Sequence, residues 1–179
     1  RFHCHNKFRA RFNRLVNGNV LMIKIAHPLD SESCYLQRVK VDSDSDAKFL
    51  FNLLAERDSR ANISHKKMPT YNSHVQFIKS KPYKNWYIIY VRNYHDKGFT
   101  FDKEKVGSIY LFKNNEIGIF ILEKFQGKDI GSFALNQLIE KNPKKRLLAN
   151  VNPKNKKSIN FFKNNGFKLI QYTFELNKT

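Results

Sequence analysis

An eight-residue stretch, Phe125 to Ser132, is the part of this chain whose residue types point most directly to chemistry. It follows the apolar run Ile117 to Leu122 and opens a helix-patterned run from Ile130 to Ile139. A strand that enters a helix through a glycine turn leaves backbone N–H groups unpaired at the helix N-terminus, where the helix dipole also favours negative charge. The stretch therefore predicts a site for the phosphates of a ligand.

The same stretch fits neither of two common nucleotide-binding motifs. A P-loop has four residues between its glycines and a Lys after the second one, whereas Lys128 lies between Gly127 and Gly131. The Gly-x-Gly-x-x-Gly dinucleotide pattern is missing, together with the acidic residue that should follow it. Taken alone, a turn with two incidental glycines at a helix end explains the stretch equally well.

The C-terminal half of the chain resembles the GNAT superfamily, the acyl-CoA-dependent N-acyltransferases. The family signature is Gln/Arg-x-x-Gly-x-Gly/Ala. It is matched here by Gln126, Lys128, Ile130 and Gly131, whereas Asp129 replaces the family's middle glycine. This departure places a carboxylate inside the segment that would hold pyrophosphate.

Two later segments extend the resemblance. Leu147 to Asn155 looks like the family's fifth strand and the turn after it. Asn155 to Phe167 looks like its last helix and cap, with the pattern Asn-x-x-Ala/Ser-x-x-Leu/Phe-Tyr and then Gly-Phe. The resemblance is strong from about Gly107 to Leu176, weaker from Cys34 to Tyr90, and does not cover the first twenty-one residues.

The resemblance implies acetyl-CoA as co-substrate and assigns residues to it. Ile119 and Ile121 would lie on the strand that pairs with pantetheine, and Asn155 would contact the cofactor from the turn before the last helix. The pyrophosphate cradle would consist of Gln126, Gly127, Lys128, Asp129, Ile130, Gly131 and Ser132.

Glu116 is the best candidate for a general base. It opens the expected fourth strand, where many members of the resembled family place a base carboxylate. The plainer alternative is a solvated residue after the turn Asn114-Asn115. Phe162 stands where many family members have a proton-donating Tyr, so another group or water would have to protonate the leaving thiolate.

The loop Asn62 to His74 corresponds to the segment that shapes the acceptor pocket in this family. Its two imidazoles, those of His65 and His74, titrate near neutrality, and His65 is the second candidate catalytic residue. A surface or capping role is the plainer alternative for each.

Composition limits the class of protein. The 179 residues suit one domain with a substantial core, to which sixteen Phe and eight Tyr contribute. No run is long enough for a membrane span. Cys4 and Cys34 are too few for a disulfide framework, which fits a cytoplasmic protein, and His3-Cys4-His5 lacks the second ligand pair of a metal site, so no metal is expected.

The formal net charge of +18 favours anionic partners. Nine basic and no acidic residues lie between Lys141 and Lys168, beside the expected phosphate site, so part of this excess would serve CoA. Nucleic acid is less favoured, because the aromatic motif of RNA-binding sheets is missing. The frequent pairing of Lys with Asn is also typical of a biased coding composition.

The chain is expected to divide into a basic leader, residues 1–21, that is excluded from the fold, and an N-acetyltransferase domain over residues 22–179. The domain is expected to be α/β, with a twisted mixed sheet of six to seven strands and about four helices. Strands are expected over Cys34–Val41, Trp86–Val91, Val106–Phe112, Glu116–Leu122 and Phe167–Leu176. The resemblance implies one more within Leu147 to Asn155.

The leading functional hypothesis is transfer of an acetyl group from acetyl-CoA to a primary amine of a small molecule or amino-sugar, by a monomer or homodimer. Two alternatives stay open: acylation of an RNA-linked or protein amine, and a non-catalytic nucleic-acid-binding module with the same fold.

Overall fold

The structure is a computed structural model that describes residues 33–57, 67–94, 101–143, 146–174 and 176. The leader, residues 1–21, and His65 lie outside the described residues.

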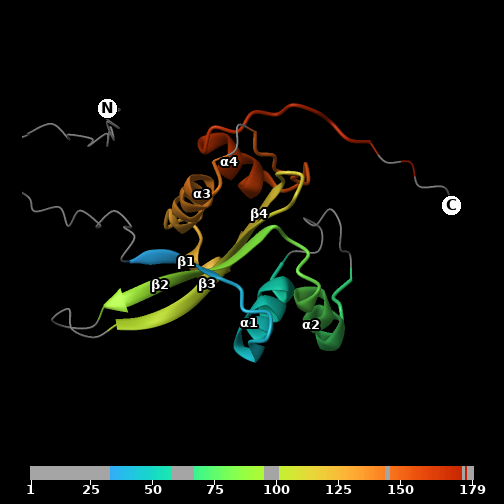
Figure 1. The fold of residues 1–179 in the computed structure, drawn as a ribbon. Helices are drawn as coiled ribbons and strands as arrows, with labels where there is room; N and C mark the ends of the chain where they lie inside the picture. The colour runs from blue at the N-terminus through green and yellow to red at the C-terminus, as the bar shows by residue number, and fades with distance from the viewer. Residues whose placement is uncertain (1–32, 58–66, 95–100, 144–145, 175, 177–179) are drawn as a thin grey trace, which may run out of the picture.

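Four antiparallel strands form one sheet in chain order (Figure 1). They are β1 (Cys34–Arg38), β2 (Asn85–Tyr94), β3 (Phe101–Leu111) and β4 (Ile117–Ile121). Short connections join β2 to β3 and β3 to β4, which favours their antiparallel pairing, whereas the chain between β1 and β2 includes two helices. The turn between β3 and β4 uses Asn115 at φ 67°, a left-handed conformation that Asn tolerates.

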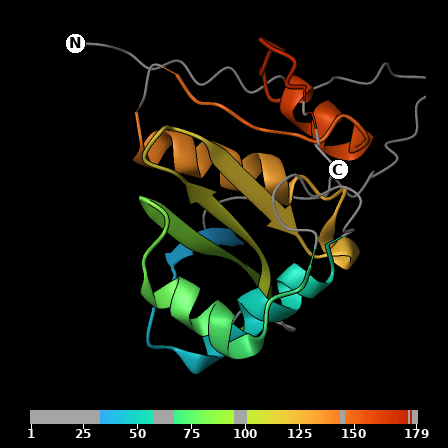
Figure 2. The same cartoon turned by 90° about the vertical axis from the view of Figure 1, so that its right-hand side faces the viewer.

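Two helices lie on each side of this sheet (Figures 1 and 2). Helices α1 (Asp44–Ala55) and α2 (Tyr71–Lys79) lie on one side, and α3 (Ile130–Lys141) and α4 (Lys156–Asn164) lie on the other. A short 3-10 turn, η2 (Glu123–Phe125), connects β4 to the loop before α3.

Helix α1 begins at an acidic, Ser-rich stretch, residues 42–46. The side chain of Ser43 accepts a hydrogen bond from the Asp46 N–H at 3.2 Å, which satisfies one free donor of the first turn. Ala47, Leu50 and Leu53 recur at helical spacing and are buried against the sheet.

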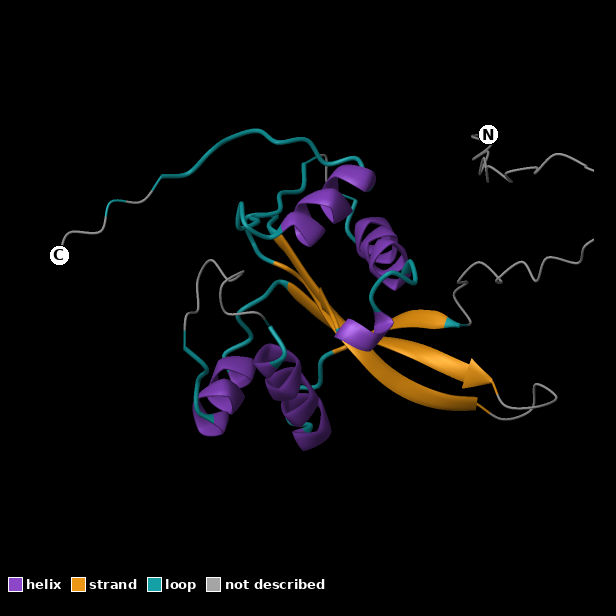
Figure 3. Cartoon of the chain, turned by 180° about the vertical axis from the view of Figure 1, so that it is seen from behind, coloured by secondary structure: helices purple, strands orange, loops and turns teal. Residues whose placement is uncertain are grey.

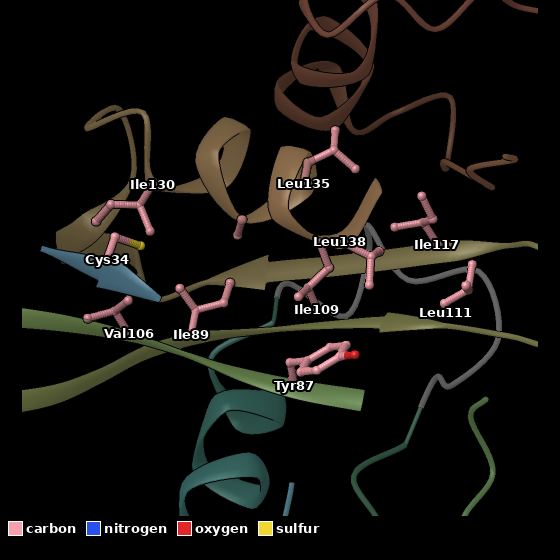
Figure 4. Close-up of a cluster of buried hydrophobic side chains, with 11 residues drawn as sticks. Cys34, Tyr87, Ile89, Val106, Ile109, Leu111, Ile117, Ile130, Leu135 and Leu138 are labelled. Carbon is pink, nitrogen blue, oxygen red and sulfur yellow. The ribbon is translucent and has the colours of Figure 1, made fainter. Parts of the chain in front are cut away.

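Alternation along the strands divides the core into two clusters. Ile117, Ile119 and Ile121 of β4 pack on the α3 side, where Leu135 is fully buried (Figure 4). Phe120 and Leu122 point to the α1 and α2 side. Each face of β4 is therefore fixed by its own layer of helices.

The expectation of six to seven strands is wrong for the residues that the structure describes, which form four. In place of the expected fifth strand, a single parallel bridge joins Glu116 to Leu148. Residues 167–174, expected as a strand, form no ladder, and beyond Phe167 the chain leaves the body as an extended segment (Figures 1 and 3). A strand needs a partner edge, and residues 146–151 pair at one point only.

Gly118 of β4 is covered by a side chain from β3. A Cβ at this position would overlap the ring of Tyr110, which lies across the strand and stacks on Tyr83 with centroids 4.1 Å apart. We expect Gly118→Ala to lower the free energy of unfolding by about 1–3 kcal/mol, as overpacking does, measured by urea denaturation.

The control for this variant is a double-mutant cycle with Tyr110→Leu. Without the ring, the penalty at position 118 should largely disappear. An equal penalty in both backgrounds would contradict the role given to Tyr110.

Candidate functional site

The edge of β4 that faces away from β3 is the centre of the candidate site. Phe112 N–H donates to Glu116 C=O at 2.8 Å, and Leu122 N–H donates to Val106 C=O at 2.9 Å. Because hydrogen-bonded pairs alternate along an antiparallel ladder, the residues at 117, 119 and 121 direct their backbone groups away from β3.

Only the first of these outward residues bonds to the backbone of a neighbouring segment that the structure describes. Ile117 N–H donates to Leu148 C=O at 2.8 Å, and the chain beyond Leu148 forms no further bridge with β4. The backbone N–H and C=O of Ile119 therefore have no hydrogen-bond partner among the described residues. An extended polar ligand could pair with this edge as an added strand would.

The far end of the edge leads into the loop that the sequence singled out. The Gln126 side chain donates from Nε2 to the Ile121 C=O at 3.0 Å, which ties this loop to the end of β4. Gly127 has φ 75°, a left-handed conformation that glycine adopts at little cost. From Gly127 to Ser132, six consecutive backbone amides donate to no described residue. Such a run is suited to binding an anion.

Asp129 departs from glycine at the position before α3. It takes φ 57°, again left-handed, and its side chain is exposed and makes no capping hydrogen bond to the helix. The carboxylate therefore points outward instead of filling the loop. A conformation that glycine adopts freely is here imposed on a residue with a Cβ, at a cost of order 1 kcal/mol.

Gly131 and Ser132 face helix α4. A Cβ on Gly131 would lie 3.0 Å from Cε2 of Phe161, and Asn165 Nδ2 donates to Ser132 Oγ at 3.2 Å. The small residue thus allows α3 and α4 to pack closely. The ammonium of Lys128 lies 5.3 Å from the ring centroid of Phe125, where it adds positive charge to the loop.

Asn155 is the N-terminal cap of α4. Its side-chain oxygen accepts a hydrogen bond from Ser158 N–H at 3.0 Å and caps α4. Its side-chain NH2 group donates to no described residue and is available to a ligand.

Glu116 lies where β4 and the Leu148 segment touch, immediately before the two separate. It is half-buried, and its N–H is held by Asn114 Oδ1 at 3.3 Å. By strand alternation its side chain is on the same face as Gly118 and Phe120, the face opposite α3. A carboxylate at this position could accept a proton from a group bound beside β4.

His74 is part of the packing between α1 and α2. It is buried, and its ring lies 5.5 Å from that of Phe51. Its Nε2 has no hydrogen-bond partner, and burial lowers the pKa of its imidazole. His65 lies outside the described residues, so its candidate role stays a prediction.

Phe162 is buried against Phe167, with ring centroids 5.1 Å apart, and therefore fills core. Sequence reasoning did not find Arg57, whose guanidinium lies 5.2 Å from the ring centroid of Phe120. No local motif marks Arg57, since only the packing of α1 on the sheet brings it to β4.

Two classes of feature are not found in the part of the chain that the structure describes. There, no three His, Cys, Asp or Glu residues gather as metal ligands would. Nor does any helix within the described ranges have the length and apolar character needed to cross a bilayer.

Comparison with known proteins gives a consistent family assignment. The family model described as "Acetyltransferase (GNAT) family" matches residues 62–167. A search of curated proteins gave no significant match.

Solved structures share the fold at low sequence identity. A domain from Methanocaldococcus jannaschii aligns with a TM-score of 0.66 at 22% identity, over 79% of this chain and 92% of that domain. RimL, the ribosomal L7/L12 α-N-protein acetyltransferase in complex with coenzyme A, gives 0.61 at 16% identity, over 80% and 84%. A spermidine N-acetyltransferase from Vibrio cholerae gives 0.56 at 15% identity, over 83% and 88%.

The buried His74 predicts a pH-dependent stability. Because its pKa is lowered from 6.5 in the folded protein, the unfolded chain binds a proton more readily as pH falls below about 6.5. This contribution to the free energy of unfolding is therefore fully present above that pH and is lost below it. Urea denaturation at about pH 7.5 and 5.5 should show a smaller loss in His74→Leu than in the wild type. Equal losses in the two proteins would contradict the assignment.

Proposed function

The chain belongs to the GNAT acetyltransferase family, and on that premise we propose that it transfers an acetyl group from acetyl-CoA to a primary amine of a small molecule or amino-sugar. One observation carries this proposal: the unpaired edge of β4 leads directly into a loop with a run of free amides. A ligand with an amide-containing arm and a pyrophosphate matches both parts in sequence.

Free polar groups indicate which residues would hold each part of the cofactor. The backbone edge at Ile119 and Ile121 would hold the pantetheine arm, and the amides from Gly127 to Ser132 would hold the pyrophosphate. Gln126 orients this loop through its bond to Ile121, and Lys128 and Asn155 add a positive charge and a free NH2 group.

Acetyl-CoA supplies the acetyl group as a thioester: the amine nitrogen bonds to the carbonyl carbon, the carbon–sulfur bond breaks, and the proton lost by the amine balances the one gained by the CoA thiolate. Glu116 would accept the amine proton, directly or through water. His65 is the other proposed catalytic residue, and the buried His74 is a poorer candidate because α1 and α2 enclose it.

A protein or RNA-linked amine is the second candidate acceptor. The net charge of +18 favours it, since a basic surface attracts a polyanionic substrate. Transfer that weakens steeply as salt rises would favour this alternative over a small neutral acceptor. Salt-sensitive binding of nucleic acid without any acetyl transfer would instead indicate a non-catalytic module.

The cofactor assignment predicts the behaviour of Asp129→Gly. The variant removes a carboxylate beside the phosphate loop and a left-handed non-glycine residue, so its affinity for CoA should equal or exceed that of the wild type, measured by isothermal titration calorimetry. A marked loss of affinity would show that Asp129 takes part in binding. Absence of CoA binding to the folded wild-type protein would contradict the proposed function.

The catalytic assignment predicts the behaviour of Glu116→Gln. If Glu116 is the general base, kcat should fall by about 10²–10⁴-fold while CoA affinity stays near that of the wild type. Steady-state kinetics over a range of pH measures both the fall and the loss of the basic limb. An unchanged kcat across pH would remove Glu116 from the mechanism and leave His65 as the next candidate.

A further inference from the structure

Arg57 is a cation beside the strand that carries the candidate site. It follows the end of α1, and its guanidinium lies 5.2 Å from the ring centroid of Phe120 in β4. Its Nε is buried and has no hydrogen-bond partner. No carboxylate within the described ranges forms an ion pair with it. A buried donor left unpaired is unfavourable, so a ligand that pairs with it removes that cost.

The surroundings of Arg57 are aromatic. Burial raises the pKa of the Tyr83 hydroxyl, and the nearby Arg57 guanidinium opposes that rise. Tyr83 stacks on Tyr110, whose ring covers Gly118. An ion pair formed against such aromatic walls is less screened than one in open water. Arg57 itself is only half-buried, so a ligand can reach it.

A second observation concerns the adjoining surface on the same side of the sheet. A groove of about 710 Å³ is lined by Tyr83 and Trp86, by the basic residues Arg38, Lys40, Lys81 and Lys84, and by one acidic residue, Asp42. The three lysines are exposed and form no ion pair with any residue that the structure describes. The positive field thus extends from Arg57 along this face, and it favours anions over cations.

We propose, building on the proposed function, that the acceptor amine carries an anionic group, a carboxylate or a phosphate, and that Arg57 binds that group. The guanidinium is planar and forms paired hydrogen bonds with either group. Phe120 supports the guanidinium on one side of β4, and the unpaired backbone of Ile119 lies at the outer edge of the same strand. The acceptor would therefore be anchored beside the bound thioester.

The same arrangement disfavours polyamines. A second ammonium group near Arg57 would be repelled, and the net charge of +18 adds to that repulsion. Substrate choice is thus expected to differ from that of the spermidine N-acetyltransferase that shares the fold.

The test compares amines that differ in one group. Lysine and cadaverine share a primary amine and differ by a carboxylate, and phosphoethanolamine and ethanolamine differ by a phosphate. With acetyl-CoA and the full chain, we expect kcat/KM to be about 10- to 100-fold higher for the anionic member of at least one pair, the usual effect of a hydrogen-bonded charge. The pair that shows the preference identifies the anion as carboxylate or phosphate.

The variant Arg57→Met should reduce that ratio to near one, mainly through a higher KM for the anionic amine, and Arg57→Lys should restore part of it. Lys113→Gln removes an equal charge from an exposed position in the turn between β3 and β4 and should leave the ratio unchanged. CoA titration verifies that each variant is folded.

Two results would overturn the inference: a wild-type enzyme that prefers cadaverine and ethanolamine, or an anionic preference that survives in Arg57→Met. These outcomes differ from failure of the proposed function, which would appear as absence of CoA binding to the folded wild-type protein.

Discussion

Strand β4 is hydrogen-bonded along one edge to β3 and, among the residues that the structure describes, its other edge pairs with the backbone of a neighbour at one end only. The candidate site depends on this difference between the paired edge and the open edge of β4. If residues 146–151 had continued to pair with β4, the backbone of Ile119 would have been satisfied within the sheet and unable to bind a ligand. A single bridge at Leu148 fixes the position of the neighbouring segment and then leaves the edge open.

The two faces of β4 have different neighbours. Ile117, Ile119 and Ile121 pack against α3, which holds the strand and the start of that helix in fixed relation. Glu116, Gly118 and Phe120 occupy the opposite face, beside Tyr110 and Arg57. Since side chains alternate along a strand, these six consecutive residues hold α3 on one side and place polar and aromatic groups on the other.

Backbone conformation, more than side-chain chemistry, accounts for the loop before α3. Gly127 and Asp129 both take positive φ, and the amides from Gly127 to Ser132 have no partner among the described residues. The glycine two residues later, Gly131, serves a different purpose, because its missing Cβ admits the ring of Phe161. The two glycines of one motif are therefore needed for different reasons: Gly127 for its torsion angle and Gly131 for helix packing.

Local patterns in the sequence determined the elements around the site: the Ser43 cap, the alternation in β4, the Asn turn before it and the glycine loop after it. These features depend on residues a few positions apart, so they can be predicted from the sequence alone. Tertiary structure decided the rest. The strand expected over Phe167–Leu176 is absent from residues 167–174, since alternation alone cannot supply a partner edge. Arg57 reaches Phe120 across sixty-three residues of chain, a contact made by the packing of α1 on the sheet and by no pattern in the sequence.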